Sequence, residues 1–312
     1  MTTGLNSRLD MVEAWQELIN NRAFLLFNGA RFSDETLAIL QECWDYRQLE
    51  NQKKNNKYAQ WFYLTLAVNS LFTEDVNRGI PASLAMELLA LAADILDDLA
   101  DNDNDEVPWR RMAPAIALHA GTCFSMLSYQ ALTTIDDPRQ FKDLASLFCA
   151  TGSRACDGQI QETIFQNKEN MAQEEYLKSI AKKSASLTGC ACEAGAITGG
   201  ASIEDRILIS CYGYNIGMMA QIHNDLHDII DTTGKSDFNQ GKKSLPVIYV
   251  QNVLQGEPNW DRDGLRRMLT DTGAIHYCNF LCETFTSEAL NALEQVNVPT
   301  EKKKGLMSIV AP

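Results

Sequence analysis

The sequence lacks the features that mark several common protein classes. Lys and Arg together number 27 against 41 Asp and Glu, which gives a formal net charge of −14, and no basic stripe marks a nucleic-acid surface. No apolar run reaches the roughly 20 residues that a membrane-spanning helix needs. The N-terminal segment also lacks an apolar signal core. These absences predict a cytoplasmic protein with no nucleic-acid partner and no transmembrane segment.

Cysteine pairs, proline and glycine are also scarce. The nine cysteines form no CxxC pair, and most lie within apolar helical patterns, which is typical of reduced core thiols. Only 8 prolines and 18 glycines interrupt 312 residues. Alternating strand patterns are too short to form a sheet, and neither an internal repeat nor a low-complexity tract is present. Disulfide-rich, sheet-based and repeat architectures are therefore not expected.

Helical periodicity dominates the chain instead. Hydrophobic residues make up 45% of the sequence, enough for a sizeable core. Pro81 and Pro114 stand where the first turn of a helix tolerates proline. The pattern predicts an all-α protein with one domain over residues 1–312, a single large helical bundle. The predicted helices include residues 61–71, 81–99, 114–132, 141–165, 174–196, 204–230, 245–254 and 284–296.

An acidic cluster ends the apolar helix predicted over residues 81–99, in the segment LAADILDDLADNDND. Asp97 and Asp98 each share a helical face with Asp101, at spacings that place Cβ atoms about 5–6 Å apart. Their like charges need a compensating partner. Carboxylate oxygens suit Mg²⁺, which keeps several waters and bridges to substrate phosphates. Taken alone, the motif favours a solvated acidic helix end over a Mg²⁺ site, although its position at the end of an apolar run argues against a purely solvated face.

A second cluster, in GYNIGMMAQIHNDLHDIID, ends another long apolar helix. Gln221, Asp225 and Asp228 fall at hydrogen-bonding spacing on one helical surface, and Asn224 lies a turn before Asp228. Two such helices facing each other across a bundle would form an oxygen-lined cage. The second cluster therefore predicts a partner for the first.

A glycine-flanked basic loop, GKSDFNQGKKSLP, follows the second cluster and contains Lys235 and Lys242. Metal ions can bridge carboxylates to a diphosphate, and lysines can neutralise the charge that remains. The order of acidic helix end and basic loop therefore indicates a site for a metal-bound diphosphate.

In order and spacing, these motifs resemble those of the trans-isoprenyl diphosphate synthases, the polyprenyl synthetase family. Asp97-Asp98-Leu99-Ala100-Asp101 resembles the first DDxxD motif of that family. Residues 221–228 resemble its second motif, QIxDDxxD, with Asn224 in place of the first aspartate. Further matches, over about residues 50–255, are Glu87 in the first-motif helix, Gly158-Gln159 for GQ, Lys183-Ser184-Ala185-Ser186-Leu187 for KTxxL, and residues 237–246 for DLxxGKxTLP.

The resemblance implies the isoprenoid synthase fold, a helical bundle with a central substrate cavity, and a homodimer. It implies a Mg²⁺-dependent prenyltransferase that ionises an allylic prenyl diphosphate. The implied metal ligands are Asp97, Asp98, Asp101, Asp225 and Asp228, and the implied catalytic residues are Lys183, Lys242 and Gln221. The implied substrate-binding residues are Lys57, Arg110, Arg111, Gln159, Asn224, Lys235, and Ala92 and Ala93, whose small side chains leave room at the tunnel floor or, alternatively, permit tight helix packing.

Two departures from the family pattern concern the acceptor. Members that add isopentenyl diphosphate carry GKxxRP before the first motif, whereas this chain has Asn56-Lys57-Tyr58-Ala59-Gln60-Trp61, with Gln60 at the arginine position. Their RRG element follows the first motif closely, whereas Arg110-Arg111 is displaced here and lacks the glycine. Because arginine grips phosphate through a planar fork that other residues do not reproduce, these changes predict a weak isopentenyl site.

The string DDLADNDN followed by Trp109 resembles a narrower group, the ComQ-type proteins, which place a prenyl chain on a peptide tryptophan. The sequence alone therefore ranks transfer to an acceptor such as a peptide tryptophan first. Chain elongation with isopentenyl diphosphate is the second possibility, and the lost arginine argues against it. Terpene cyclisation is a third, and the absence of a clear NSE motif argues against it. A binding protein that has lost catalysis is the non-enzyme alternative.

Overall fold

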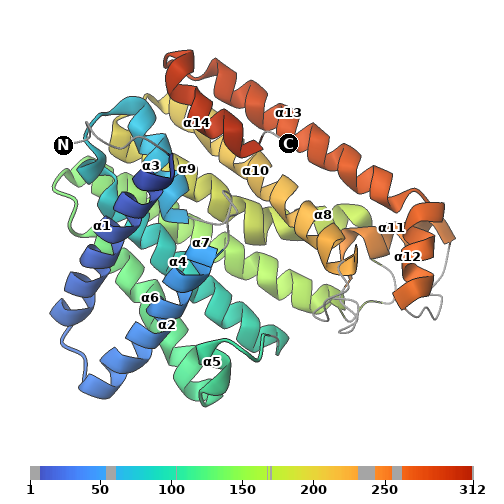
Figure 1. Ribbon diagram of the computed structural model, residues 1–312, viewed down its shortest axis with the longest axis horizontal. Helices are drawn as coiled ribbons and strands as arrows, with labels where there is room; N and C mark the ends of the chain where they lie inside the picture. The colour runs from blue at the N-terminus through green and yellow to red at the C-terminus, as the bar shows by residue number, and fades with distance from the viewer. Residues whose placement is uncertain are drawn as a thin grey trace. The chain divides into compact units, whose positions relative to one another are not determined.

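In the part of the chain that it describes, the computed structural model is built of helices (Figure 1). It describes residues 8–53, 61–102, 104–166, 168, 171–230, 243–254 and 262–310, and no strand occurs within these ranges. The prediction of an all-α fold is confirmed. The helices of eight or more residues are α1 (Arg8–Gly29), α2 (Asp34–Lys53), α3 (Trp61–Phe72), α4 (Ile80–Asp101), α6 (Pro114–Leu132), α7 (Pro138–Gln166), α8 (Gln173–Ile180), α9 (Ser186–Gly199), α10 (Ile203–Ile230), α11 (Leu245–Leu254), α12 (Arg262–Asp271), α13 (Ala274–Gln295) and α14 (Thr300–Val310).

The chain divides into two compact units. Unit 1 comprises residues 1–149, 191–207 and 297–311, and unit 2 comprises residues 150–190, 208–296 and 312. Helices α7, α9 and α10 each contain a point at which the chain passes from one unit to the other. A single domain over residues 1–312 with a central cavity stays a prediction.

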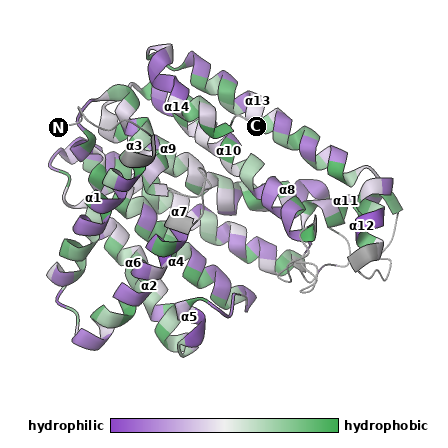
Figure 2. Cartoon of the chain, in the orientation of Figure 1, coloured by the Kyte–Doolittle hydropathy of each residue, from purple (hydrophilic) through white to green (hydrophobic). Residues whose placement is uncertain are grey.

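In unit 1, helix α4 packs against α1, α3 and α6. Its residues are buried almost without interruption from Ile80 to Ala92, so the helix is apolar on most faces. Gly121 lets α6 approach closely, because a Cβ there would lie 3.2 Å from Ile95 Cγ2. By contrast, α1 and α2 alternate between hydrophobic and hydrophilic residues (Figure 2), as expected of helices that bury one face. The first acidic motif thus ends a rigid core helix.

In unit 2, the C-terminal half of α10 packs into an apolar cluster. Ile222 and Leu226 of α10 lie with Leu245 and Ile248 of α11 and with Cys278 of α13. A neighbouring cluster joins the end of α10 to α11 and α12 through Ile229, Val250, Leu265 and Leu269. The second acidic motif therefore also ends a helix that is anchored by buried side chains.

The helix predicted over residues 174–196 is interrupted in the structure. The π-helical turn η2 (Ala181–Ala185) separates α8 from α9. Two glycines allow neighbouring helices to approach this turn. A Cβ on Gly158 of α7 would lie 2.6 Å from Lys183 N, and one on Gly217 of α10 would lie 2.6 Å from Ala185 Cα. Single π turns occur frequently at functional sites.

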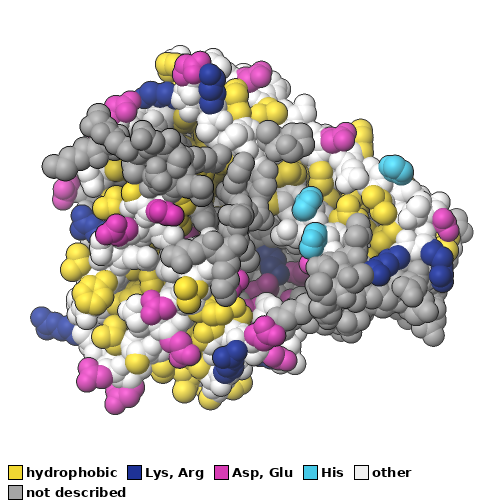
Figure 3. Space-filling model, viewed as in Figure 1, with side chains coloured by type: hydrophobic (Ala, Val, Ile, Leu, Met, Phe, Trp, Pro, Cys, Tyr) yellow, Lys and Arg dark blue, Asp and Glu magenta, His cyan; other side chains and the backbone are white. Residues whose placement is uncertain are grey.

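Across the described ranges, none of the helices has the length and apolar composition that a membrane span requires. On the face in Figure 3, Lys and Arg side chains are dispersed among Asp and Glu side chains.

Candidate functional site

The first acidic motif lies at the C-terminal end of α4, in unit 1. Asp97 and Asp101 are partly exposed there, one helical turn apart. Asn102 closes the helix in the left-handed conformation, at φ 54°, and its N–H donates to the Asp98 carbonyl. Asparagine tolerates this conformation better than most residues because its short polar side chain bonds locally. The chain therefore turns away immediately after Asp101.

Asp98 differs from its neighbours because its carboxylate is directed into the protein. Only 8% of the residue is exposed. The Trp109 indole Nε1 donates to Asp98 Oδ2 at 2.7 Å, and Asn104 Nδ2 donates to Asp98 Oδ1 at 2.5 Å. The predicted metal ligand is thus also the anchor of the loop that follows the helix.

The two arginines predicted to bind substrate lie in the short helix α5 (Pro108–Arg111), which follows this loop. Arg110 Nη2 donates to Asn102 Oδ1 at 2.6 Å and to Asp105 Oδ1 at 3.2 Å. Arg111 is exposed to solvent. Arg110 is therefore held beside the acidic motif by the loop itself.

A buried ion pair lies near the middle of α4. Glu87 is fully buried and accepts hydrogen bonds from Arg47 Nε at 2.9 Å, Asn51 Nδ2 at 2.8 Å and the Phe62 N–H at 3.2 Å. Arg47 Nη1 also donates to Asp94 Oδ2 at 2.5 Å. Burial by itself lowers the pKa of Arg47, but the Asp94 and Glu87 carboxylates outweigh it and raise the pKa above its ordinary value. Glu87 thus ties together the residues that flank positions 54–60.

The second acidic motif lies at the C-terminal end of α10, in unit 2. Asp225 is 3% exposed and accepts hydrogen bonds from the Tyr176 hydroxyl, from Gln221 Nε2 at 3.0 Å and from the Leu245 N–H at 3.2 Å. Gln221 Oε1 in turn accepts from Ser184 Oγ at 2.8 Å. Gln221 therefore orients Asp225 and links it to the π turn.

The other polar residues of this motif are more accessible. Asn224 is exposed and Asp228 is partly exposed. The same helix end also carries His223 and His227, whose rings stack with centroids 6.5 Å apart. The second motif consequently offers solvent fewer carboxylates than the first.

Lys183 lies in the π turn and forms an ion pair with Glu162 of α7. The Lys183 Nζ to Glu162 Oε2 distance is 2.7 Å, and both side chains are partly exposed. Because the pair is accessible, an incoming anion can compete with Glu162 for the ammonium group. Glu162 was not singled out from the sequence, although it lies one helical turn beyond Gly158-Gln159.

Two cysteines of α13 lie close enough to the second motif for its charge to affect them. Burial, with a further contribution from Asp225, raises the pKa of Cys278 to about 12 and that of Cys282 to about 11. Both thiols therefore stay protonated at neutral pH, which disfavours a nucleophilic role.

The remaining predicted residues have mixed positions. Ala92 is 1% exposed in the packing of α4, whereas Ala93 and Gln159 are partly exposed. Lys57, Gln60, Lys235 and Lys242 lie outside the described residues. Their predicted roles stay predictions.

The donor set at the end of α4 suits Mg²⁺. Its side chains offer oxygen ligands, and Asp97 and Asp101 are both accessible. Among the described residues, no group of three or more His, Cys, Asp or Glu is arranged to hold a metal by itself. Mg²⁺ is typically held by one or two carboxylates, with waters and substrate phosphates completing its shell. The residues therefore fit a metal that arrives with a diphosphate.

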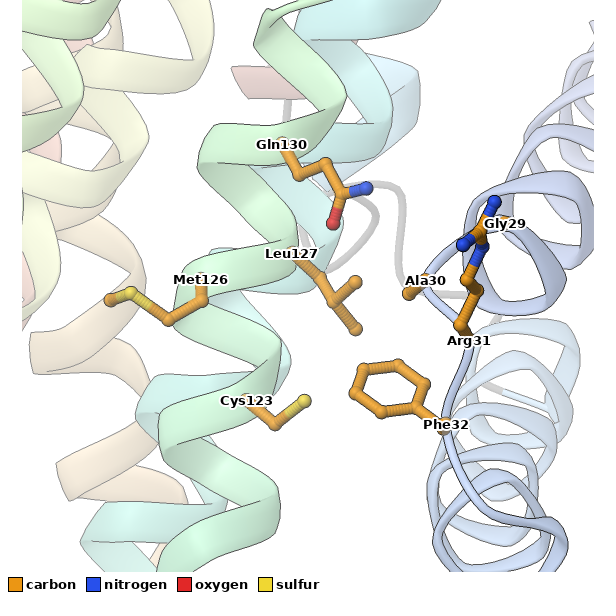
Figure 4. Close-up of a pocket in the computed structure, with 8 residues that line it drawn as sticks. All are labelled: Gly29, Ala30, Arg31, Phe32, Cys123, Met126, Leu127 and Gln130. Carbon is orange, nitrogen blue, oxygen red and sulfur yellow. The ribbon is translucent and has the colours of Figure 1, made fainter.

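A surface cavity of about 410 Å³ in unit 1 lies between the end of α1 and the middle of α6 (Figure 4). Cys123 and Leu127 of α6 point toward Phe32, whereas Met126 points away from it. None of the residues that line the cavity belongs to either acidic motif. This cavity is therefore not assigned to the diphosphate.

Two anchored helices of this chain end in carboxylate clusters. Arg110 lies beside the first cluster, and Lys183 lies near the second. These are features of an enzyme that binds a diphosphate through metal ions. The polyprenyl synthetase family profile matches residues 44–272, well over half of the chain. The chain belongs to the polyprenyl synthetase family, as its motifs predicted.

Similar proteins support this assignment. A short chain isoprenyl diphosphate synthase of Methanocaldococcus jannaschii is 28% identical over 225 residues, which is 68% of this chain and 65% of that protein. The tryptophan prenyltransferase ComQ of Bacillus spizizenii is 25% identical over 229 residues, 68% of this chain and 79% of that protein. The match thus spans slightly under two thirds of the length of the archaeal relative.

The fold has solved counterparts. A polyprenyl synthetase from Streptomyces coelicolor A3(2) superposes with a TM-score of 0.80 at 19% identity, covering 96% of this chain and 97% of that one. This likeness confirms the isoprenoid synthase fold that the sequence motifs implied.

Proposed function

We propose that the chain is a Mg²⁺-dependent isoprenyl diphosphate synthase that joins an allylic prenyl group to isopentenyl diphosphate. The observation that carries the proposal is the pair of anchored carboxylate motifs in a chain of the polyprenyl synthetase family. The sequence alone ranked another acceptor first. The relatives favour elongation instead, because that of Methanocaldococcus jannaschii is a short chain isoprenyl diphosphate synthase.

In this proposal the accessible carboxylates hold the metal. Asp97 and Asp101 are the ligands at the end of α4, and Asp228 is the ligand at the end of α10. Mg²⁺, when bound, supplies positive charge that stabilises the departing diphosphate. The buried Asp98 and Asp225 keep the two helix ends in place through their hydrogen bonds.

The cations of the chain bind the diphosphate oxygens that carboxylates repel. Lys183 leaves its ion pair with Glu162 and binds the allylic diphosphate instead. Lys235 and Lys242, in the segment that precedes α11, add further positive charge. Charge that is already in position when the C–O bond ionises stabilises the transition state more than mobile water does. Lys57, Arg110 and Arg111 bind isopentenyl diphosphate. Gln60, at the position where the family has an arginine, weakens that subsite.

Transfer to a peptide tryptophan is a second candidate. The match to ComQ of Bacillus spizizenii, which covers 79% of that protein, favours it, and so does Gln60 at the arginine position. Both candidates share the ionisation of an allylic diphosphate and differ only in the nucleophile.

The family likeness also leads us to propose a homodimer through α6. Ile116, Leu118 and Met126 of this helix are 44%, 49% and 58% exposed, and Phe24 and Leu25 of α1 in the same unit are 60% and 62% exposed. Large exposed apolar side chains on one unit favour a protein partner, here a second copy of the chain. Sedimentation should report a dimer, and Leu118→Glu should shift it toward monomer.

Product analysis tests the proposal. Purified protein is incubated with Mg²⁺ and labelled geranyl, farnesyl or geranylgeranyl diphosphate, with and without isopentenyl diphosphate. Elongated diphosphates that form only when isopentenyl diphosphate is present are expected. Without elongation, transfer of the label to a tryptophan-containing peptide would favour the second candidate, and an absence of any Mg²⁺-dependent product would refute both.

A further inference from the structure

We propose that Trp109 is a positioning residue for the first acidic motif and acts through Asp98. Its indole Nε1 lies 2.7 Å from Asp98 Oδ2. The residue is 4% exposed, and its ring meets Tyr46 edge-on, with centroids 5.6 Å apart and an interplanar angle of 89°. Packing thus fixes the plane of the indole, and with it the direction of its single N–H.

The consequence for Asp98 is that both carboxylate oxygens are engaged. Asn104 Nδ2 donates to Oδ1 at 2.5 Å, from a residue in the left-handed conformation at φ 57°. Asp98 is 8% exposed, whereas Asp97 and Asp101 are partly exposed. The aspartates of this motif therefore have two different roles. Asp98 fastens Asn104 and Trp109 to the end of α4, and the partly exposed Asp97 and Asp101 are the residues proposed to bind the metal.

The same loop holds Arg110 beside the motif. Arg110 directly follows Trp109, and its Nη2 donates to Asn102 at 2.6 Å and to Asp105 at 3.2 Å. A shift of Trp109 would therefore move both the Asp98 carboxylate and the guanidinium group. Two charges of opposite sign at the diphosphate subsite depend on one indole.

The kind of donor also matters. A lysine or arginine at this position would place a cation against Asp98 and reduce the negative charge that attracts Mg²⁺. Indole is a neutral donor without acceptor capacity. Trp109 therefore orients the carboxylate without competing with the metal, a role that an apolar or cationic residue of similar volume would not fill.

The inference rests on the proposed function, and its test separates the two. Calorimetry measures the Kd of inorganic pyrophosphate for the full chain at fixed Mg²⁺, and urea unfolding without Mg²⁺ measures stability. If the unchanged chain binds no pyrophosphate with Mg²⁺, the proposed function fails before any variant is compared. Trp109→Phe keeps an aromatic ring at this position, removes the N–H and leaves a small cavity where the second indole ring was, a loss that a Trp→Phe control elsewhere reproduces.

Trp44→Phe is the matched control, because Trp44 in the same unit is 2% exposed and donates from Nε1 to Asn20 Oδ1 at 3.2 Å. Both variants should lose stability. Only Trp109→Phe should weaken pyrophosphate binding, by about tenfold, the scale of one hydrogen bond to a charged group. It should also raise the Mg²⁺ concentration needed for half-maximal binding. Equal Kd values for the two variants, within twofold, would overturn the proposal.

A double-mutant cycle with Asp98→Asn tests the route of the effect. If Trp109 acts through Asp98, the double variant should bind pyrophosphate little worse than Asp98→Asn alone. Fully additive losses would contradict that route. Should Trp109→Phe fail to fold, Asn104→Gly removes the other donor to Asp98 at a position whose positive φ suits glycine. It should weaken pyrophosphate binding in the same way, and unchanged binding would count against the inference.

Discussion

The two acidic helix ends each bury an inner aspartate, but different parts of the chain supply the hydrogen-bond donors. In each, an inner aspartate is buried and accepts hydrogen bonds from an aromatic side chain and a side-chain amide. At the end of α4 the aromatic donor is Trp109, 11 residues after Asp98. At the end of α10 it is Tyr176, 49 residues before Asp225. The first end is closed by its own loop, and the second by helices distant in sequence.

The outer residues of the two ends also differ. The first end has two partly exposed aspartates, Asp97 and Asp101, whereas the second has Asp228 and the neutral Asn224. Because negative charge attracts Mg²⁺, the proposed function predicts that the first end contributes more to metal binding than the second. The second end is better suited to hold the segments around Lys183 and Leu245 in register.

The largest expected effect comes from the outer carboxylates. Asp101→Asn should lower kcat on the order of 10³-fold, the upper range for loss of one transition-state charge contact, and Asp228→Asn by about tenfold to 100-fold. Removal of Mg²⁺ with EDTA should abolish turnover. Glu301→Gln in α14 is the control, because the Glu301 side chain is 77% exposed and belongs to neither motif. Equal losses at Asp101 and Asp228 would show that the two ends do not differ as metal sites.

The next effect concerns the π turn of unit 2. Lys183→Ala should slow ionisation by about 100-fold, since it removes one cation from the leaving group. Lys302→Ala should leave kcat unchanged, because Lys302 pairs with the exposed Glu74. Single-turnover rates with a labelled allylic diphosphate measure both. Comparable small losses for the two variants would mean that Lys183 does not contact the diphosphate.

The free energy of unfolding should distinguish the buried Asp98 and Asp225 from the exposed Asp105. Asp225→Ala removes the acceptor of the Tyr176 hydroxyl and the Leu245 N–H and should lower the free energy of unfolding by about 3 kcal/mol. Asp98→Ala removes the acceptor of the Trp109 indole and should lower it by about 2 kcal/mol. Asp105→Ala should change it by less than about 0.5 kcal/mol. Urea unfolding without Mg²⁺ measures all three. A gain in stability at Asp98 or Asp225 would show that like-charge repulsion outweighs these hydrogen bonds.

The smallest effect tests the glycine contacts of the π turn. Gly158→Ala places a methyl group 2.6 Å from Lys183 N and should cost about 1–2 kcal/mol, with a matching fall in diphosphate affinity. Gly305→Ala in α14 has no neighbour within 4 Å and should instead stabilise the protein by up to about 1 kcal/mol. Thermal unfolding compares them. A stabilising Gly158→Ala would mean that the turn has room to move.

Much of the fold could be predicted from the sequence. Hydrophobic periodicity gave the bounds of α6 and α11 without error, and the motifs around Asp97–Asp101 and Gln221–Asp228 indicated the family that the profile match confirms. These features are local, because a helix face and a motif spacing are set by residues a few positions apart. The π turn at Lys183 was not predicted, since it lies where Gly158 and Gly217 approach from two other helices.

The sequence by itself determined which side chains the acidic helix ends carry and at what spacing. Helical spacing also places Asp98 on the buried stripe of Leu91 and Ile95. Only the tertiary structure decided which groups bond the buried carboxylates. Asp98 receives the Trp109 indole because Asn102 and Asn104 adopt positive φ and turn the chain back onto α4. Asp225 is singled out in the same way by Tyr176 and the Leu245 N–H. A hydrogen bond between segments distant in sequence depends on how helices pack, and packing is not encoded in any one stretch of the chain.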